Sequence, residues 1–531
     1  MSISSLNKSK INSWLSHKEN VYFISLLAVA LIIRVYYLFL SKGQVMWWDE
    51  AEYMSAAKHW ALGVPYSLNE QRPPLFQLLG AGLIKLGFTE IFLKFLLVLL
   101  PSIALIVVTY YLGKELFGSK VALIGALGTS FVWSLLFWSV RFQPDFISVT
   151  LQLMAFLFFW KFVKSSSRKH AALTGLFCAA GFYFKISALL VPLSIGLFLL
   201  YKDGWKAIKV KNHWIILGSF IIGLIPFMIW QTLTFGSPLA FGVTYSGDFN
   251  EGRALGWEAL KFYSFFSKTI FYISFLLGLV MFLLNYAKNI SSVFKNKSLR
   301  SDPWFFSFIV LLVISAFYVF YIKGTIEDRW VFLMIPFTFF FAGKFICSIY
   351  DLILKNSKFL GVLFLGVLFL SFILPQINHS TNLINDRKGS YLPVKEASLL
   401  IKENSSPLDK ILSISYTQTT AYAEREVITY SKLPIENFTQ ILKEDRPKFV
   451  IVSILEPHHP DWMVQQVRNQ EGFTAILFSY FNSTVILSPQ NQIVQYDVKK
   501  QVSNEVANFS LIYPLEGNFG GLLAYKIDYL D

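Results

Sequence analysis

Three carboxylates follow the first long apolar segment of the chain, which covers residues 21–40. Asp49, Glu50 and Glu52 lie in the stretch VMWWDEAEYMSA at 45–56. Carboxylates beside a membrane surface can deprotonate a hydroxyl group or hold a divalent cation. They also have a simpler interpretation. Asp49 would cap a helix, Glu52 would complete a capping box, and the two tryptophans would belong to an interfacial aromatic belt.

Basic side chains lie near the ends of other apolar segments. Arg72 precedes two prolines. Arg141 and Asp145 share the turn RFQPD, Lys185 lies in a tight turn, and Arg329 starts a later segment. A guanidinium or ammonium group at this depth can bind a phosphate at headgroup height. Long basic side chains also reach toward the headgroups of ordinary lipids, so this second role stays open. If the acids and bases converge, they suit a lipid-phosphate substrate and an acceptor in the aqueous space.

The composition indicates a polytopic α-helical membrane protein. Of the 531 residues, 54% are hydrophobic and only 15% are charged, whereas about 25% are charged in an average globular protein. The two cysteines, Cys178 and Cys347, lie inside apolar segments and predict neither a disulfide nor a metal site. We expect about 11 membrane-spanning helices, at residues 21–40, 94–112, 120–138, 146–163, 170–184, 186–201, 213–235, 268–287, 304–322, 330–350 and 358–375.

The distribution of positive charge predicts the orientation of these helices. If the N-terminus (1–20) is cytoplasmic, alternate loops on its side are all basic, namely 113–120, 163–170, 201–213, 286–300 and 350–358. This topology explains most of the net charge of +14 without a nucleic-acid partner. We therefore expect a multi-pass protein of the cell membrane that contacts membrane lipids, with its C-terminal part on the outer side.

Two outer regions differ from the apolar segments. The first external loop, 41–93, contains an interrupted apolar stretch at 70–88, which predicts a helix along or dipping into the membrane surface. Residues 376–531 predict an extracytoplasmic α/β domain, with a helix at 394–405 and strands at 410–416, 425–430, 448–455, 474–481 and 483–489. The remaining part, 21–375, is the expected transmembrane catalytic domain.

Seven short motifs occur in one order along residues 20–350, namely WWDEAEYMSAA, RPPLFQLLGAGLIKLG, YYLGKELFGSKVALIGAL, RFQPDFI, GLFCAAGFYFKISALLVP, FGSPLAFG and DRWVFLMIPF. In this order they resemble motifs of the GT-C glycosyltransferases, in particular the protein O-mannosyltransferase and aminoarabinose transferase group. The chain departs from that pattern twice, with Arg72 in place of a histidine and Trp330 in place of a tyrosine.

The resemblance implies the transfer of a hexose or pentose, with inversion, from a polyprenyl-phosphate donor to an acceptor hydroxyl on the extracytoplasmic face. Asp49 would be the catalytic carboxylate that activates or orients the acceptor, and Glu50 and Asp145 would support that site. The donor phosphate would be held by Arg72, Arg141, Lys185 and Arg329. The resemblance does not identify the acceptor, which would be a protein, a glycan or a lipid.

The resemblance leaves the use of a divalent metal ion open, because some of its members need one and others do not. A cationic Arg72 suits a phosphate better than a metal. The stretch EPHHPD, with Glu456, His458, His459 and Asp461, contains two prolines and no ligand pair at helical spacing, so it is interpreted as a polar turn.

Other functions compete with glycosyl transfer. A transporter or flippase of a lipid-linked glycan would need charged or broken helices near the bilayer midplane, whereas the ionisable groups here gather at one face. Arg34, inside the first apolar segment, is either functional or extends toward the headgroups. The remaining alternatives are a non-catalytic GT-C-like protein and the transfer of a whole oligosaccharide.

Overall fold

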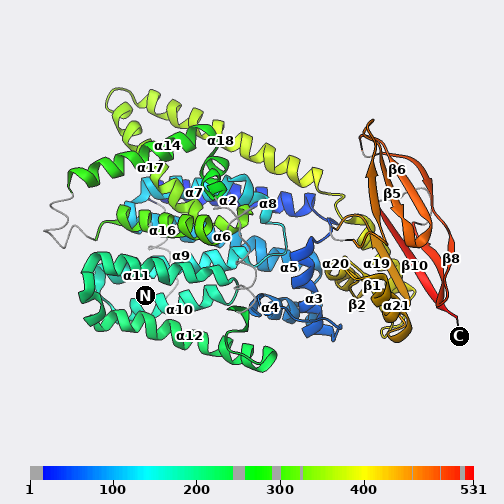
Figure 1. The fold of residues 1–531 in the computed structure, drawn as a ribbon. Coiled ribbons are helices and arrows are strands. Elements are labelled where there is room, and N and C mark those ends of the chain that lie inside the picture. The colour runs from blue at the N-terminus through cyan, green and yellow to red at the C-terminus, as the bar shows by residue number, and fades with distance from the viewer. Residues whose placement is uncertain are drawn as a thin grey trace, which may run out of the picture. The chain divides into compact units, whose positions relative to one another are not determined.

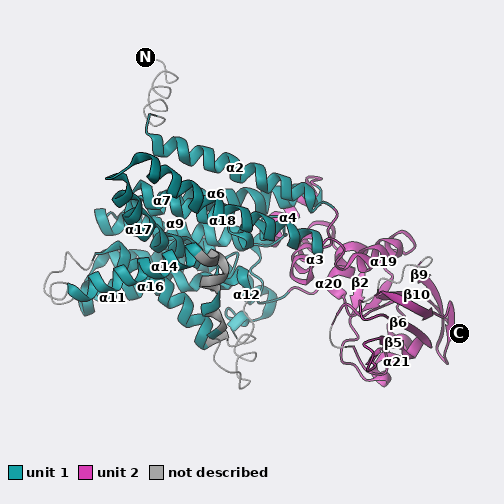
Figure 2. Cartoon of the chain, turned by 90° about the horizontal axis from the view of Figure 1, so that it is seen from above, with its two compact units in different colours: residues 1–42, 69–76, 89–386 teal, residues 43–68, 77–88, 387–531 magenta. Residues whose placement is uncertain are grey.

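The computed structural model describes residues 16–242, 257–289, 301–322, 327–456, 459–490, 492–514 and 521–530 (Figure 1). They divide into two compact units that do not follow the order of the chain (Figure 2). Unit 1 comprises residues 1–42, 69–76 and 89–386, and unit 2 comprises residues 43–68, 77–88 and 387–531. Most of the first external loop thus belongs with the C-terminal residues. The domain limits expected from the sequence, at 20, 41, 93 and 375, stay predictions.

Unit 1 is a bundle of long apolar helices. Within the described ranges, nine helical segments are long and apolar enough to cross a membrane. They are α2 (Lys18–Leu40), α5 to α6 (Glu90–Phe117), α9 (Asp145–Ser165), the α11 segment (Ile186–Lys209), α12 (Lys211–Phe235), the end of α14 (Ile270–Lys288), the α16 segment (Pro303–Phe320), α17 (Met334–Leu354) and α18 (Lys358–Asp386). A helix satisfies its own backbone hydrogen bonds, so these segments suit a hydrocarbon environment.

Two further predicted spans coincide with shorter helices, so the count of 11 stays a prediction. The segment 120–138 divides at Val132 into α7 (Ser119–Phe131) and α8 (Trp133–Trp138), and the segment 170–184 forms α10 (Arg168–Phe182). In the external loop, α4 (Leu75–Lys85) has 11 residues. It is about 16 Å long and falls short of the roughly 30 Å of a bilayer core, which agrees with the surface helix expected at 70–88.

Arg34 links α2 to the end of α7 inside unit 1. Its side chain is fully buried and donates hydrogen bonds to Ser102 Oγ (3.0 Å), Ser130 O (2.9 Å) and Thr129 O (3.1 Å). Carbonyl groups in the last turn of a helix have no intrahelical donor, and Arg34 supplies one to α7. Its partners lie in the protein interior, so the interpretation that it extends toward the headgroups is wrong.

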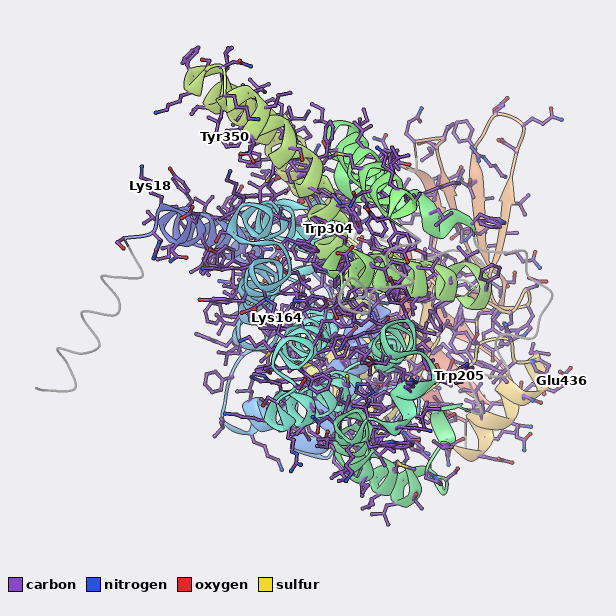
Figure 3. The ribbon with its side chains drawn as sticks, turned by 90° about the vertical axis from the view of Figure 1, so that its left-hand side faces the viewer. Lys18, Lys164, Trp205, Trp304, Tyr350 and Glu436 are labelled. Atoms are coloured by element: carbon purple, nitrogen blue, oxygen red, sulfur yellow. The ribbon has the colours of Figure 1, made fainter. Side chains whose placement is uncertain are left out.

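One end of unit 1 gathers residues from several of the predicted basic loops. Lys120 pairs with Asp351 (2.6 Å), and Lys164 pairs with Glu115 (3.0 Å). Figure 3 looks onto this side of the helices, with Lys164 and Tyr350 labelled. Three of the loops expected on one membrane face therefore meet at one end of the bundle.

The described residues of unit 2 form two sheets together with helices, which confirms the predicted α/β domain. The first has the order β2-β1-β3-β10-β9-β8, in which β1 runs parallel to β2 and β3, and β10 runs antiparallel to β3 and β9. The second is antiparallel, with the order β4-β5-β6-β7. The strands are β1 (Lys410–Ser413), β2 (Glu426–Ile428), β3 (Phe449–Ser453), β4 (Gln465–Arg468), β5 (Thr474–Phe478), β6 (Ser483–Leu487), β7 (Ile493–Asp497), β8 (Gln501–Ser503), β9 (Ala507–Tyr513) and β10 (Leu522–Tyr529).

The centre of the first sheet is covered on both faces. Along β3, Phe449 and Ile451 pack into one apolar cluster with α19 (Leu392–Glu403), while Val450 and Val452 pack into another with α21 (Ile435–Glu444). Successive side chains of a strand point to opposite faces, so a strand covered on both sides is apolar throughout. Two cores therefore hold the domain together.

Candidate active site

An ion pair joins two of the predicted site residues in unit 1. Asp145 begins α9 and is almost completely buried, and Lys185 immediately precedes the short helix η2 (Ile186–Leu189). Lys185 Nζ donates a hydrogen bond to Asp145 Oδ1. Burial lowers the pKa of Lys185, and the Asp145 carboxylate opposes this effect. Asp145 thereby favours the charged form of Lys185.

Arg329 lies in the short helix η7 (Asp328–Val331) beside an aromatic ring. Its guanidinium carbon is 5.2 Å from the centroid of Trp138, and it forms an ion pair with Glu327. The same Trp138 donates from Nε1 to Asp328 Oδ2 at 3.0 Å. Asp328 also accepts a hydrogen bond from Ser134, and its burial raises its pKa. Asp328, which precedes Arg329 in the chain, is thus fixed to α8.

Lys185 and Arg329 line the same cavity. Its wall also contains the polar side chains of Gln152, Ser187 and Tyr318. The remaining wall is largely apolar, with Val149, Leu190, Ile314, Trp330 and Leu333. The cavity is about 10 Å³, the size of about one water molecule, so its two cations and apolar wall match a lipid phosphate in chemistry and not in size.

Each of the two cations of this cavity forms an ion pair with a carboxylate. Lys185 and Arg329 are matched by Asp145 and Glu327. The Asp145 side chain is 2% exposed, whereas that of Glu327 is 48% exposed. Exposed ion pairs contribute little, so an arriving phosphate can replace Glu327 at Arg329 more easily than it can replace Asp145 at Lys185.

The other two predicted phosphate ligands are not among the described residues that line this cavity. The Arg141 side chain is buried, and its guanidinium carbon lies 6.0 Å from the ring of Phe137. Arg72 is partly exposed, and its backbone N–H donates to Asn69 O at 3.1 Å in a turn. Of the four cations grouped from the sequence, Lys185 and Arg329 line one cavity.

Asp49 and Glu50 belong to helix α3 (Trp48–Leu62) of unit 2. The helix is capped at Trp47, whose backbone N–H donates to Glu50 Oε2 at 2.8 Å. The simpler interpretation, in which Asp49 caps the helix with Glu52, is therefore wrong by two residues. Asp49 lies one position inside the start of α3 and is partly exposed, while Glu50 is completely buried.

Sequence reasoning missed several polar groups around the cavity. Gln152 and Tyr318 lie inside apolar segments, and Ser187 lies two residues after Lys185. Gln152 Nε2 donates to Ser148 Oγ at 2.9 Å, one turn earlier on α9. The spacing of Asp145, Ser148 and Gln152 at three and four residues places them on one helix face, and this pattern was available in the sequence.

No cluster of three His, Cys, Asp or Glu side chains that could hold a metal ion occurs in the part of the chain that the structure describes. His458 of the predicted polar turn lies outside the described residues, while Glu456 is buried and Asp461 is exposed.

Residues 71–230 match the family model of dolichyl-phosphate-mannose-protein mannosyltransferase. This match includes Arg72, Arg141, Asp145 and Lys185. No curated protein matches the chain by sequence.

Three of the solved structures that share the fold are the following. ArnT from Cupriavidus metallidurans, bound to undecaprenyl phosphate, is 14% identical, with a TM-score of 0.57 over 81% of this chain and 93% of ArnT. The apo oligosaccharyltransferase of Archaeoglobus fulgidus is 13% identical, with a TM-score of 0.57 over 81% of this chain and 69% of its own. The same organism's AglB, with an inhibitory peptide and a dolichol-phosphate, has a TM-score of 0.56 at 13% identity, over 90% of this chain and 74% of AglB.

These matches confirm the resemblance to the GT-C glycosyltransferases. They also confirm the predicted fold class, a polytopic helical membrane protein with a C-terminal sheet-containing domain.

Proposed function

Proceeding from this GT-C-type fold, we propose that the chain transfers a sugar from a polyprenyl-phosphate donor to an acceptor hydroxyl, with inversion at the sugar carbon. The observation that carries the proposal is the cavity in which Lys185 and Arg329 meet beside an apolar wall. It is supported by ArnT, whose structure holds undecaprenyl phosphate, and by AglB, whose structure holds a dolichol-phosphate.

The proposed reaction divides the work between two groups of residues. Lys185 and Arg329 hold the donor phosphate and stabilise its charge as the bond between the sugar carbon and the phosphate oxygen breaks. Asp49 accepts the proton of the acceptor hydroxyl while its oxygen forms the new bond to the sugar carbon. Polyprenyl phosphate leaves with the electron pair of the broken bond, so no nucleotide and no redox partner is needed.

The supporting residues act indirectly in this proposal. Glu50 supports Asp49 by capping α3, and Asp145 supports Lys185 through their ion pair. Arg72 and Arg141 bind the same phosphate in this proposal, because they lie in motifs that resemble those of the GT-C glycosyltransferases.

The proposed orientation follows from the positive charge of the loops. The basic loops at one end of unit 1 and the N-terminus face the cytoplasm, and the C-terminal domain lies on the outer side of the membrane.

The proposal is tested by the release of polyprenyl phosphate from purified protein in detergent with lipid. A panel of polyprenyl-phosphate hexoses, pentoses and a lipid-linked oligosaccharide is supplied with an envelope extract as acceptor. We expect release from a single-sugar donor and an inverted product. Release from the oligosaccharide alone would replace the proposal with oligosaccharide transfer. Movement of intact donor across a vesicle without any release would replace it with a flippase. A parallel reaction with a chelator decides metal use.

A further inference from the structure

Helix α3, which carries Asp49, packs against a helix of the C-terminal domain that lies more than 350 residues further along the chain. This partner is α20 (Tyr416–Ala423), and both helices belong to unit 2. The contact therefore joins the proposed catalytic carboxylate to the part of the chain whose role the sequence leaves open.

Hydrogen bonds hold α3 to α20 at three places. The Met46 N–H, just before α3, donates to the hydroxyl oxygen of Tyr422 at 3.0 Å. In the middle of the helix, Ser55 Oγ donates to Thr417 O at 3.0 Å. Toward its end, Lys58 Nζ donates to Ala421 O at 2.7 Å. The contacts thus run from the start of α3 almost to its end.

An ion-pair network and an aromatic contact add to these hydrogen bonds. Lys58 Nζ lies 2.7 Å from Glu424, which also pairs with Lys402 of α19 at 2.6 Å. The ring of Trp48, the first residue of α3, meets the ring of Tyr416 edge to face at 4.9 Å between centroids. The network extends the attachment from α20 to a second helix of the domain.

The contact at the start of α3 is buried. Met46 is 1% exposed and Tyr422 is 5% exposed. A buried N–H that loses its acceptor is costly, so this hydrogen bond specifies where the chain enters α3. Asp49 follows Met46 by three residues, so the position of its carboxylate depends on this entry point.

We infer that the C-terminal domain positions the catalytic helix, with Tyr422 and the Lys58–Glu424 pair as positioning residues. This inference rests on the proposed function of Asp49. Displacement of a reacting group by about 1 Å can lower a rate by roughly 100-fold. The domain therefore acts on the rate of transfer through α3, independently of any role in binding the acceptor.

The test compares four single variants of the full chain with the wild type. Tyr422→Phe removes the acceptor of the Met46 N–H, and Lys58→Met removes the charge and both donated bonds of Lys58. Lys58→Arg retains a cation that can bond to Glu424. Lys526→Met is the matched control, because Lys526 forms an exposed pair with Asp528 (2.9 Å) on β10 of the same domain.

We expect Tyr422→Phe and Lys58→Met to lower kcat about tenfold or more, while the KM for the donor changes less than about twofold. Lys58→Arg recovers most of kcat, and Lys526→Met retains the wild-type rate. Amide hydrogen exchange over residues 46–62 should be faster in Tyr422→Phe and unchanged in Lys526→Met, which checks the contact without reference to activity.

Three outcomes would overturn the inference. The first is that the wild type is active, while Tyr422→Phe and Lys58→Met leave both kcat and hydrogen exchange unchanged. This result would contradict the positioning role and leave the proposed function intact. An equal loss of activity in Lys526→Met would show a general effect of domain stability. A wild type that releases no polyprenyl phosphate would remove the proposed function, and the inference with it.

Discussion

The two cations of the cavity are distinguished from other basic side chains by what surrounds them. Lys185 is paired with a buried carboxylate, and Arg329 lies over the Trp138 ring. Both are fixed before a ligand arrives, so little side-chain freedom is lost on binding. We therefore expect Lys185 and Arg329 to act on the donor and not on the acceptor.

Replacement of Lys185 by Gln should weaken the use of the donor. A hydrogen bond to a charged group contributes about 1.5–3 kcal/mol, which corresponds to a loss of roughly 10- to 100-fold in kcat/KM for the donor. The control is Lys206→Gln, because Lys206 is exposed in η3 (Gly204–Lys209) at the opposite end of its helix segment. Equal kcat/KM in both variants would show that Lys185 does not hold the donor.

Asp145→Asn should shift the pH dependence of donor binding. Lys185 binds phosphate in its charged form, so binding is present below the pKa of Lys185 and is lost as the pH rises through it. Burial lowers this pKa, and the Asp145 carboxylate opposes the effect. Without that carboxylate, the pKa of Lys185 falls further, and the rise of the donor KM at alkaline pH begins at a lower pH. A pH profile of KM that is unmoved, or moved upward, contradicts the ion pair's role.

At the scale of helices, a close approach between α14 (Lys261–Lys288) and α17 supports the bundle. A Cβ atom on Gly278 would lie 1.9 Å from the backbone oxygen of Phe341. Gly278→Ala should therefore push these helices apart and destabilise the protein by about 1–3 kcal/mol. Thermal unfolding in detergent measures this against Gly218→Ala on α12, where a Cβ atom meets nothing within 4 Å. Equal melting temperatures for the two variants would contradict the close contact.

The elements differ in how well the sequence predicts them. Long apolar segments correspond to long helices, because burial in lipid demands about 20 apolar residues. The five predicted strands match β1, β2, β3, β5 and β6. Strand β4 was missed because all four of its residues are exposed and its sequence shows no alternation of apolar and polar residues.

The site was harder to predict than the elements. The acidic stretch allows two capping registers, and residue preferences favour Asp49 as the cap, whereas the structure uses Trp47 and Glu50. The meeting of Lys185 and Arg329 depends on helices far apart in the sequence, so it follows from packing and not from spacing.

For the whole molecule, the proposed topology predicts that the basic loops face the cytoplasm and that the C-terminal domain lies on the outer side of the membrane. Single cysteines at Lys206 and Val467 test it, because both positions are exposed. With Cys178 and Cys347 replaced by alanine, an impermeant thiol reagent added to intact cells should label Val467→Cys and spare Lys206→Cys. The reverse pattern would place the C-terminal domain in the cytoplasm and contradict the proposed orientation.

The central claim, that Asp49 activates an acceptor for transfer from a polyprenyl-phosphate sugar, is tested most directly by one rate comparison. The release of polyprenyl phosphate is measured for the wild type, Asp49→Asn and the control Asp461→Asn, in which an exposed acid of the same unit is changed. General base catalysis contributes roughly 100- to 10,000-fold. The account predicts a loss of at least about 100-fold in Asp49→Asn, with unchanged donor binding and full activity in Asp461→Asn. A folded Asp49→Asn protein that releases polyprenyl phosphate at the wild-type rate would contradict it.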